Sequence, residues 1–433
     1  MKNTIVKILQ KQFSNGIQEQ KIVIIGAGTA GVSVASQLSR NNVKKSNITL
    51  IDPATKHYYQ PGFTKIGGGV YKSDKFVSYD IESMTKGFGL IKDEVTQINP
   101  ETKLIKLKGN SEVNYDTLIV ASGLKTDFNA TEGLKESLDD PKSNVCSVYS
   151  FEYAFKTSRL RESFKGGRAL FTQPPAPIKC AGAPQKLLYL CSADWDNRKI
   201  KHESHFFTPL PQMFGIKYYS DALTEIVKQR GLNPHYMCVL HAIKNSDTAV
   251  FKNLKTNELF EEKFDFLHVV PRMKAWEYLS NISDSTGFVD VNSDLRHKRY
   301  SNIWAIGDCN NLPNAKTAAA VFSQSPVLVH NLLNNDKKTY CGYSACPIFL
   351  GNRKLMLAEF TIKLNEKGET ETTITPTFEK NQNVPKIRYY FLTASLGIIY
   401  RLMEKGIWYG KSCIFDPTKK GFKSHFLHIF KKH

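Results

Sequence analysis

The clearest pattern of apolar and polar positions lies in residues 21–52. A short apolar run, Ile22–Ile25, is followed by a glycine-rich stretch, after which apolar residues at helical spacing continue to Leu38. A second apolar run, Ile48–Ile51, completes the pattern. Short apolar runs on either side of a segment with helical periodicity are typical of strand, helix and strand. The pattern therefore predicts a β-α-β unit of about 30 residues.

The stretch between the first strand and the helix has the spacing of a dinucleotide-binding turn. Gly26 permits a tight turn, Gly28 lets the backbone approach a pyrophosphate, and Gly31 lets helix and strand pack closely. The helix N-terminus, which includes Ala30, offers unpaired N–H groups and the positive end of its dipole. Asp52 ends the second strand, where a carboxylate can accept hydrogen bonds from ribose hydroxyls. The sequence therefore predicts a nucleotide site here.

Two later segments have the pattern of further strands in the same sheet. Residues 115–123 form an apolar run that ends in small residues, which leave room for a ligand. Residues 302–308 form a second run that ends in Gly307 and Asp308, and a helical pattern follows over Lys316–Leu333. These pieces resemble flavoproteins with two dinucleotide-binding domains. In that group the aspartate meets the ribityl chain and the helix N-terminus faces the flavin, which implies FAD as the tightly held cofactor.

A second strand, turn and helix begins at Gly167–Thr172, where the resemblance implies a domain that binds NAD(P)H. The turn, however, has three prolines and a cysteine, Cys180, in place of a glycine fingerprint. Proline lacks the N–H donor and fixes φ, so this turn is a poor phosphate cradle. The sequence predicts a domain that keeps its shape without a nicotinamide site. Electrons then reach the flavin from another source, and Cys180 lies at the mouth of the turn.

Several motifs occur in the order typical of one family: PIKCAGAPQKLLYL, FGIKYYSDAL, GDCNNLPNAKTAAA and GYSACP. They closely resemble mitochondrial-type sulfide:quinone oxidoreductases from about residue 21 to about residue 410. The resemblance implies two redox-active cysteines, Cys180 and Cys346. It also implies that the FAD contacts are Gly26, Gly28, Ala30, Gly31, Asp52, Gln60, Val95, Gly307, Asp308 and Lys316. Relatives commonly carry glutamate where this chain has the shorter Asp52.

The resemblance implies a reaction that two cysteines beside a flavin can carry out. Hydrogen sulfide, as hydrosulfide, attacks the disulfide, which leaves one cysteine as a persulfide and the other as a thiolate. We assign the persulfide to Cys180 and the flavin-adjacent thiolate to Cys346. The sulfane sulfur passes to a small acceptor such as glutathione or sulfite, and the flavin reduces a ubiquinone-type quinone. Lys179 and the following helix N-terminus are candidates for lowering a thiol pKa.

The other cysteines and one histidine have simpler interpretations. Cys146, Cys191, Cys238, Cys309 and Cys413 lie in apolar or strand-end contexts, where inert thiols are expected. Cys341 and Cys346 form a C-x4-C pair without a second pair or a histidine, so we predict no metal site. His268 is expected to be a packed histidine rather than a proton carrier.

The chain has 433 residues, a net charge of +19 and a pI near 9.4, which favour an anionic partner. Because no basic motif interleaved with aromatic residues stands out, nucleic acid is disfavoured. No run of about 20 apolar residues is present, so no membrane-spanning helix is expected. The first 18 residues contain three lysines and no acid. They resemble a mitochondrial targeting segment without its usual arginines, and a disordered basic tail is the alternative.

Residues 386–433 combine tyrosine, tryptophan and aliphatic residues with many basic ones. This composition suits a pair of amphipathic helices in a membrane interface, where a quinone confined to the bilayer can be reached. The alternative is a soluble helix that packs on the core of the protein. We expect the protein at the mitochondrial inner membrane as a peripheral, monotopic protein.

Together these observations predict an α/β fold with two nested Rossmann-like domains and a C-terminal membrane-docking region. The predicted parts are a targeting-like segment (1–20), a discontinuous FAD-binding domain (21–140 and 297–350), a second Rossmann-like domain (141–296) and a C-terminal region (351–433). A type II NADH:quinone oxidoreductase is the main enzymatic alternative, but it would need a second glycine fingerprint. A flavocytochrome-type sulfide dehydrogenase would need an export signal, and a flavin-bearing scaffold protein would show no turnover.

Overall fold

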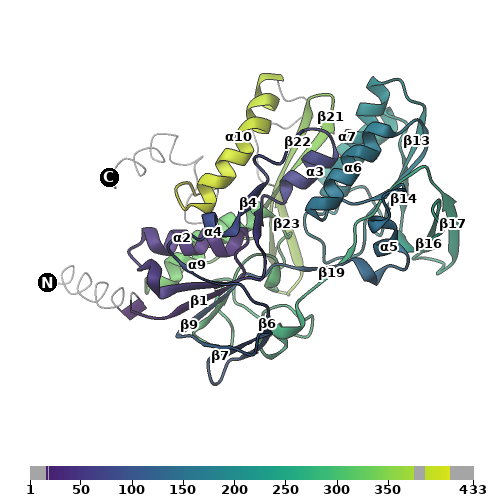
Figure 1. Cartoon of the computed structure of the whole chain (residues 1–433). Coiled ribbons are helices and arrows are strands. Elements are labelled where there is room, and N and C mark those ends of the chain that lie inside the picture. The colour runs from purple at the N-terminus through teal and green to yellow at the C-terminus, as the bar shows by residue number, and fades with distance from the viewer. Residues whose placement is uncertain (1–15, 18, 375–385, 410–433) are drawn as a thin grey trace.

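The computed structural model describes residues 16–17, 19–374 and 386–409. Most of the predicted targeting segment and the end of the predicted docking region, residues 410–433, lie outside this range. Among the described helices, none is both long and apolar enough to cross a membrane. The structure has the mixed α/β architecture with parallel sheets that the sequence predicts (Figure 1).

The first sheet is parallel and has the strand order β20-β9-β1-β2-β5. Its strands are β1 (Ile22–Ile25), β2 (Ile48–Ile51), β5 (Gly89–Ile91), β9 (Thr117–Val120) and β20 (Ile303–Ala305). One face is covered by α2 (Thr29–Arg40) and α9 (Ala318–Leu333). The other face is covered by the hairpins β6 (Val95–Asn99), β7 (Leu104–Leu107) and β8 (Glu112–Asn114).

The apolar run of β1 is buried on both faces, as expected for a central parallel strand. Ile22 and Ile24 pack in the cluster with α2 and α9, whereas Val23 and Ile25 pack in the cluster with β6 and β7. Successive strand residues point to opposite faces of the sheet. The four consecutive apolar residues of β1 therefore pack against the two helices on one face and against the hairpins on the other. This packing fixes the glycine turn at the carboxyl end of β1.

The second sheet is also parallel and has the order β11-β18-β12-β13-β14. Its strands are β11 (Val145–Cys146), β12 (Gly167–Thr172), β13 (His202–Thr208), β14 (Asn233–Tyr236) and β18 (Phe266–His268). Its helices are α5 (Leu134–Asp139), α6 (Phe151–Ser163), α7 (Ala183–Asn197) and α8 (Lys217–Gln229). A three-stranded antiparallel sheet, β15 (Cys238–Lys244), β16 (Thr248–Asn253) and β17 (Leu259–Lys263), packs beside it.

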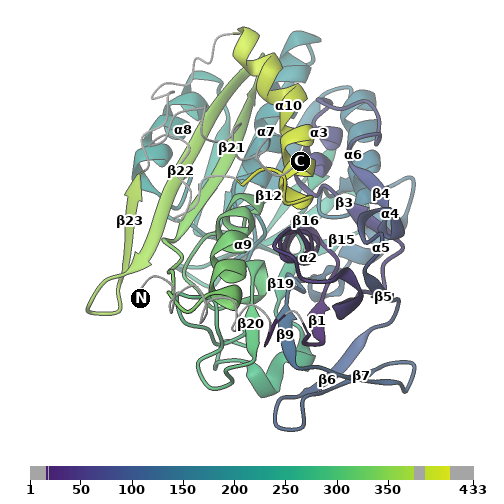
Figure 2. The same ribbon diagram turned by 90° about the vertical axis from the view of Figure 1, so that its left-hand side faces the viewer.

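The two parallel sheets are joined by β10 (Lys125–Asp127) and β19 (Arg272–Lys274), which pair antiparallel. The first sheet draws its strands from residues 22–120 and 303–305, and the second from residues 145–268. The chain therefore leaves the first sheet, builds the second and returns (Figure 2).

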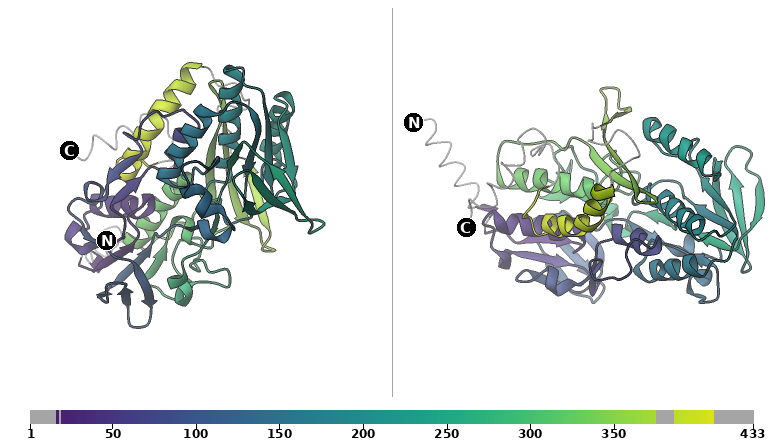
Figure 3. Two further views of the ribbon diagram at one scale, coloured as in Figure 1. Left: turned by 45° about the vertical axis from the view of Figure 1, so that its right-hand side comes forward. Right: turned by 90° about the horizontal axis from the view of Figure 1, so that it is seen from above.

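A third, antiparallel sheet follows the return to the first domain and bridges the two. It contains β21 (Tyr343–Gly351), β22 (Lys354–Leu364) and β23 (Thr370–Ile374), and α10 (Lys386–Glu404) lies beside it (Figures 2 and 3). β21 packs against α7 of the second domain and α9 of the first. Four short elements complete the fold: β3 (Lys56–Tyr58), α3 (Pro61–Gly67), β4 (Ser78–Asp80) and α4 (Ile81–Met84).

Candidate active site

A cavity of about 450 Å³ lies where the glycine turn, the loop before α7, β21 and α10 meet. The carboxyl ends of β9 and β20 also reach it, as expected for a ligand site in a parallel α/β sheet. Ten of the sequence-predicted residues line this single cavity: Gly26, Gly28, Ala30, Asp52, Gln60, Gly307, Asp308, Lys316 and the cysteine pair, Cys180 and Cys346.

The glycine turn has the geometry of a dinucleotide cradle. Gly26 has φ of +100°, and a Cβ there would lie 2.6 Å from the carbonyl oxygen of Ala121. A Cβ on Gly31 would lie 1.8 Å from the carbonyl oxygen of Gly26, so this position tolerates only glycine. A Cβ on Gly28 would meet nothing within 4 Å, and Gly28 faces the cavity. Backbone atoms therefore fill the space beside Gly26 and Gly31, whereas the space beside Gly28 is open to the cavity, where a pyrophosphate would lie.

Asp52 is held in place by the backbone and still faces the cavity. One carboxylate oxygen accepts a hydrogen bond from the Ala27 N–H at 2.7 Å, and the other accepts from the Ala54 N–H at 2.9 Å. Each oxygen keeps a further lone pair, so the carboxylate can still accept hydrogen bonds from ribose hydroxyls. The residues present thus fit the nucleotide half of FAD.

The opposite end of the cradle is formed by the loop after β20 and the start of α9. The Gly307 N–H donates to Gln324 at 2.8 Å, which positions Asp308 at the cavity. Burial raises the pKa of Asp308, while Lys316 and Lys179 oppose that shift. Lys316 donates to the carbonyl of Asn310 at 2.6 Å. The N-terminus of α9 also lines the cavity and can stabilise negative charge there.

Two of the sequence-predicted residues lie outside the cavity lining. Gly31 is behind the turn, where it permits the close approach of α2 to Gly26. Val95 begins β6 and packs against the cluster formed by β6, β7 and the first sheet.

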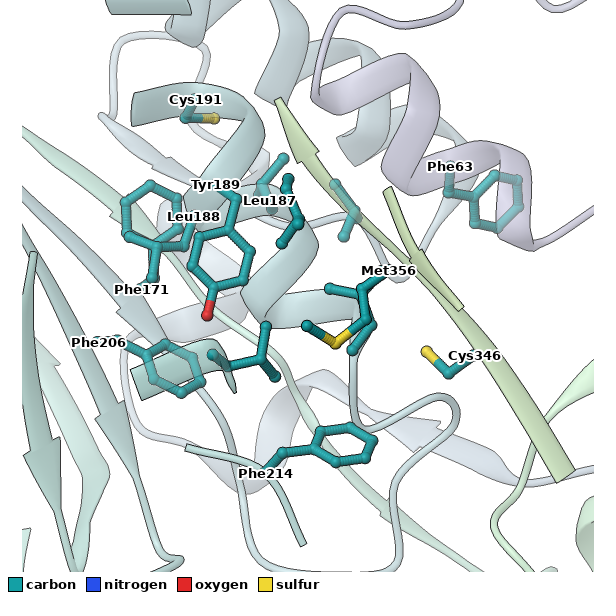
Figure 4. Packing of buried hydrophobic residues seen from close by; sticks show 14 of the residues in the cluster. Phe63, Phe171, Leu187, Leu188, Tyr189, Cys191, Phe206, Phe214, Cys346 and Met356 are labelled. Carbon is teal, nitrogen blue, oxygen red and sulfur yellow. The ribbon is translucent and has the colours of Figure 1, made fainter. Parts of the chain in front are cut away.

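The cysteine pair comes from two distant segments. Cys180 lies in the loop between β12 and α7, and Cys346 lies in β21, 166 residues later. Their Sγ atoms are 3.4 Å apart, and both are free thiols. Figure 4 shows Cys346 at the edge of a packed cluster that includes Phe214, Leu187 and Met356. Cys346 is 2 % exposed and Cys180 is partly exposed, so a small nucleophile reaches Cys180 more easily.

The backbone around the pair holds the two sulfurs together. Cys180 has φ of +53°, in the left-handed region that non-glycine residues rarely adopt. Its N–H donates to the Lys316 carbonyl at 2.8 Å, and its own carbonyl accepts from the Ala183 N–H at 2.8 Å. A Cβ on Gly182 would lie 2.6 Å from the Cys346 sulfur. Glycine at 182 therefore gives Cys346 the space to approach Cys180.

The two thiols titrate very differently. The hydrogen bond from the Cys346 thiol lowers the pKa of Cys180, and the ammonium of Lys186, 3.3 Å from the Cys180 sulfur, lowers it further. The same hydrogen bond, together with burial, raises the pKa of Cys346 well above its usual value. Cys180 is therefore the thiolate of the reduced pair and Cys346 the thiol.

The cation beside Cys180 is Lys186, and the expectation that Lys179 has this role is wrong. The Lys179 ammonium instead donates to the side-chain oxygen of Gln60 at 3.3 Å. Lys186 lies in the first turn of α7, six residues after Cys180, and long helical side chains point back toward the helix N-terminus. That spacing was the available signal in the sequence.

The glycine turn after β1 is held in place by side chains of α10, a contact that was not predicted from the sequence. Buried His57 bonds the carbonyl of Ala27 through Nδ1 at 2.9 Å and the carboxylate of Glu404 through Nε2 at 2.6 Å. Tyr400 shares a hydrogen bond with Thr29 at the start of α2. Glu404 is one of only two acids in the basic segment after residue 385, which was the available signal.

The remaining cysteines and His268 are away from the cavity lining. Cys146, Cys191, Cys238 and Cys309 are buried free thiols, and burial raises the pKa of each. Cys341 is disulfide-bonded, and Cys413 lies outside the described residues. Burial lowers the pKa of His268 to about 3, so this packed histidine is neutral. Within the described ranges, no group of three or more potential metal ligands occurs.

Comparison with known proteins gives a family match and a similar solved fold. Residues 20–160 match the model of the pyridine nucleotide-disulphide oxidoreductase family. The fold resembles the solved structure of the sulfide:quinone oxidoreductase of Aquifex aeolicus, with a TM-score of 0.70 at 19% identity, over 95% of each chain.

Curated relatives match over nearly the full chain. The mitochondrial sulfide:quinone oxidoreductase of Schizosaccharomyces pombe is 36% identical over 92% of this chain and 93% of its own. The enzyme of the same name from Dictyostelium discoideum is 37% identical over 92% of this chain and 89% of its own. The chain therefore belongs to the mitochondrial sulfide:quinone oxidoreductase family.

Proposed function

We propose that the protein oxidises hydrogen sulfide at Cys180 and Cys346 and passes two electrons through FAD to a quinone. The observation that carries this proposal is the cysteine pair, 3.4 Å apart, in the same cavity as the glycine turn. A redox-active thiol pair and a dinucleotide cradle in one cavity are the two parts that the reaction needs. FAD, when bound, accepts the electron pair of the two thiols and releases it to the quinone.

The first step is attack of hydrosulfide on the disulfide form of the pair. The partly exposed Cys180 sulfur is attacked, the bond between Cys180 and Cys346 breaks, and a new sulfur–sulfur bond forms on Cys180. Cys180 then carries a persulfide, and the Cys346 sulfur leaves with the electron pair of the broken bond and takes up a proton, because its pKa is raised. No electrons leave the protein in this step, because the disulfide itself is the oxidant.

The second step is transfer of the outer sulfur to a small nucleophile, such as glutathione or sulfite. The bond within the persulfide breaks, the acceptor takes the sulfur and Cys180 leaves as a thiolate. A thiol of lower pKa is a better leaving group. The lysine at 3.3 Å, Lys186, stabilises that thiolate. Oxidation of the two cysteines back to the disulfide then releases two electrons to the cofactor.

We further propose that the protein docks on the mitochondrial inner membrane through α10. Tyr390 and Ile398 on this helix are 51% and 58% exposed, whereas Tyr389, Tyr400 and Glu404 of the same helix are buried. One face therefore packs on the core and the other is available to lipid. Replacing Tyr390 and Ile398 with serine should reduce co-sedimentation with anionic vesicles. Unchanged sedimentation would refute this docking surface.

The reaction is tested with Cys180→Ser and Cys346→Ser. Each variant should retain FAD but lose sulfide-dependent flavin reduction, because serine cannot form the disulfide. Cys238→Ser, at a buried thiol outside the cavity lining, is the matched control. Sulfide should reduce the flavin of this variant at the normal rate. Normal reduction of either active-site variant would contradict the proposed mechanism.

A further inference from the structure

Lys65 is a buried lysine that neither the cysteine chemistry nor the nucleotide cradle uses. It lies in α3, is 3% exposed and lines the cavity. Its Nζ donates to the hydroxyls of Tyr71 at 2.9 Å and Tyr59 at 3.3 Å. Within the described part of the chain, no carboxylate forms an ion pair with it. Burying an ammonium without a carboxylate is costly, and leucine or methionine would fill this space more cheaply.

The walls around Lys65 are aromatic and aliphatic. Its Nζ lies 4.7 Å, 5.3 Å and 5.5 Å from the ring centroids of Tyr71, Tyr59 and Phe349. Leu190, Leu396 and Ile399, from α7 and α10, line the same cavity. Such a site is apolar apart from one cation and two phenols, so it suits a ligand with an apolar body and an oxygen acceptor.

The titratable groups that face Lys65 are Tyr59, Tyr71 and Lys186. Burial, and to a lesser degree the positive charge of Lys186, lower the pKa of Lys65 to about 7. Burial raises the pKa of both tyrosines, so they stay neutral and act as hydrogen-bond partners. Lys65 therefore gains and loses its proton near neutral pH, as a proton donor must.

Two ligands compete for this site on chemical grounds: an anion, such as hydrosulfide, and a quinone headgroup. An anion that reacts at Cys180 already has a cation beside it, because the Lys186 ammonium lies 3.3 Å from the Cys180 sulfur. Apolar walls and neutral phenols solvate an anion poorly. A quinone ring fits apolar walls, and its carbonyl oxygen accepts a hydrogen bond and later a proton. The surroundings of Lys65 therefore favour the quinone.

We propose that Lys65, held by Tyr59 and Tyr71, binds a carbonyl oxygen of the quinone headgroup and supplies one proton during its reduction. This inference rests on the proposed function, because it assigns a residue to the quinone half of that reaction. Reduction of a quinone to a quinol adds two electrons and two protons. FAD, when bound and reduced, would supply the electron pair and one proton, and the ammonium of Lys65 gives the second proton.

Tyr71 connects Lys65 to α10 and to the outside. Its hydroxyl accepts from Lys65 and donates to the carbonyl of Thr393 at 3.2 Å. Tyr71 is partly exposed, so the neutral amine can recover its proton from solvent along this side. Tyr71 is thus a positioning residue that fixes the ammonium against the helix lining the cavity.

The test uses Lys65→Leu in the holoenzyme, with Lys72→Leu, at an exposed lysine after the same helix, as the matched control. Binding of a short-chain quinone to the oxidised enzyme is measured without turnover, from the perturbation of flavin absorbance. Lys65→Leu should bind the quinone roughly 10-fold or more weakly, because a hydrogen bond from a charged donor is lost. Lys72→Leu should bind it normally.

The pH dependence gives a second readout. In the native protein, flavin reoxidation by quinone should slow as pH rises through about 7, because the ammonium is lost above its pKa. Lys65→Leu should be slow at every pH. If Lys65→Leu does not fold, Tyr71→Phe should shift the pH midpoint of reoxidation, because the acceptor of the ammonium is lost while the ring remains.

Three results would overturn the assignment: unchanged quinone binding, an unchanged pH profile, or slower flavin reduction by sulfide in Lys65→Leu. The last result would make Lys65 part of an anion site. Failure of the proposed function itself is distinct, because the native protein would then not be reduced by sulfide at all.

Discussion

The turns that follow β1 and β12, one in each parallel sheet, both lead from a strand into a helix, but they have opposite chemistry. After β1, Gly26 and Gly28 leave an open cradle of backbone at the cavity. After β12, a proline-rich loop ends in Cys180, whose left-handed backbone brings its sulfur to within 3.4 Å of Cys346. One turn offers N–H donors to a phosphate, and the other offers a sulfur to a nucleophile. A shared fold therefore does not imply a shared ligand.

The neighbours of each turn sharpen the difference. The first turn is held by His57 and Glu404, which connect Ala27 to α10. The second is held by the carbonyl of Lys316, which accepts from the Cys180 N–H, and by Lys186 beside the sulfur. The first clamp fixes a binding surface, and the second fixes a reactive atom and its charge.

The largest effect is expected for Gly31→Ala. Its Cβ would lie 1.8 Å from the Gly26 carbonyl, so the turn must distort and FAD should be lost on purification. Gly28→Ala meets no atom within 4 Å and should leave the stability of the cofactor-free protein unchanged while weakening FAD binding. The flavin content after purification measures FAD binding in each variant, and thermal unfolding measures the stability of the cofactor-free protein. Equal unfolding temperatures for the two cofactor-free variants would contradict this reading of the turn.

The next effect concerns the clamp on the first turn. Glu404→Ala should lower the free energy of unfolding by roughly 3–5 kcal/mol, because it leaves His57 buried without its carboxylate. Lys405→Ala, at the exposed neighbouring residue, is the control.

The clamp should also depend on pH. Burial alone would lower the pKa of His57, but the charge and hydrogen bond of Glu404 raise it overall. Because the folded pKa is above the unfolded value of about 6.5, the stabilisation is full below 6.5 and is lost as pH rises through the folded pKa. The unfolding temperature of the native protein should therefore fall as pH rises through that range, and the unfolding temperature of Glu404→Ala should not show this fall. An identical pH dependence in both would rule out the clamp.

The smallest effect is expected at the second turn. Lys186→Met should raise the pKa of Cys180 above its lowered value of about 5. The midpoint of the alkylation rate against pH should therefore move up by about one unit, and alkylation below that midpoint should slow by about 10-fold, because one pKa unit changes the thiolate fraction there by that factor. Lys179→Met should leave the midpoint of the alkylation rate against pH unchanged. A shift with Lys179→Met and none with Lys186→Met would restore the assignment made from sequence.

Sequence alone predicted the features that depend on local pattern. The β-α-β unit of residues 21–52, the strands before Ser122 and Gly307, and the missing fingerprint after Thr172 each follow from spacing within one segment. The cysteine pair came from family motifs, because no local rule brings together two residues 166 positions apart.

Features that depend on tertiary contacts were not predicted. His57 and Glu404 are 347 residues apart, and each alone reads as an ordinary polar residue. The segment after residue 385 was predicted to bind the membrane surface, but Leu396 and Tyr400 of α10 also line the cavity. A test of membrane attachment that removes residues 386–433 would therefore also remove α10 from the wall of the cofactor site. Substitutions at exposed positions of α10 test it more cleanly.

Whether electrons enter the flavin through the cysteine pair is tested by an anaerobic titration of the purified flavoprotein, monitored by flavin absorbance. Sulfide is added to one sample and NADH to another. Sulfide should bleach the flavin or produce a long-wavelength charge-transfer band, and NADH should cause no change, because the proline-rich turn lacks a phosphate cradle. Reduction by NADH without sulfide would contradict the cysteine route, because the turn after β12 would then bind a nucleotide.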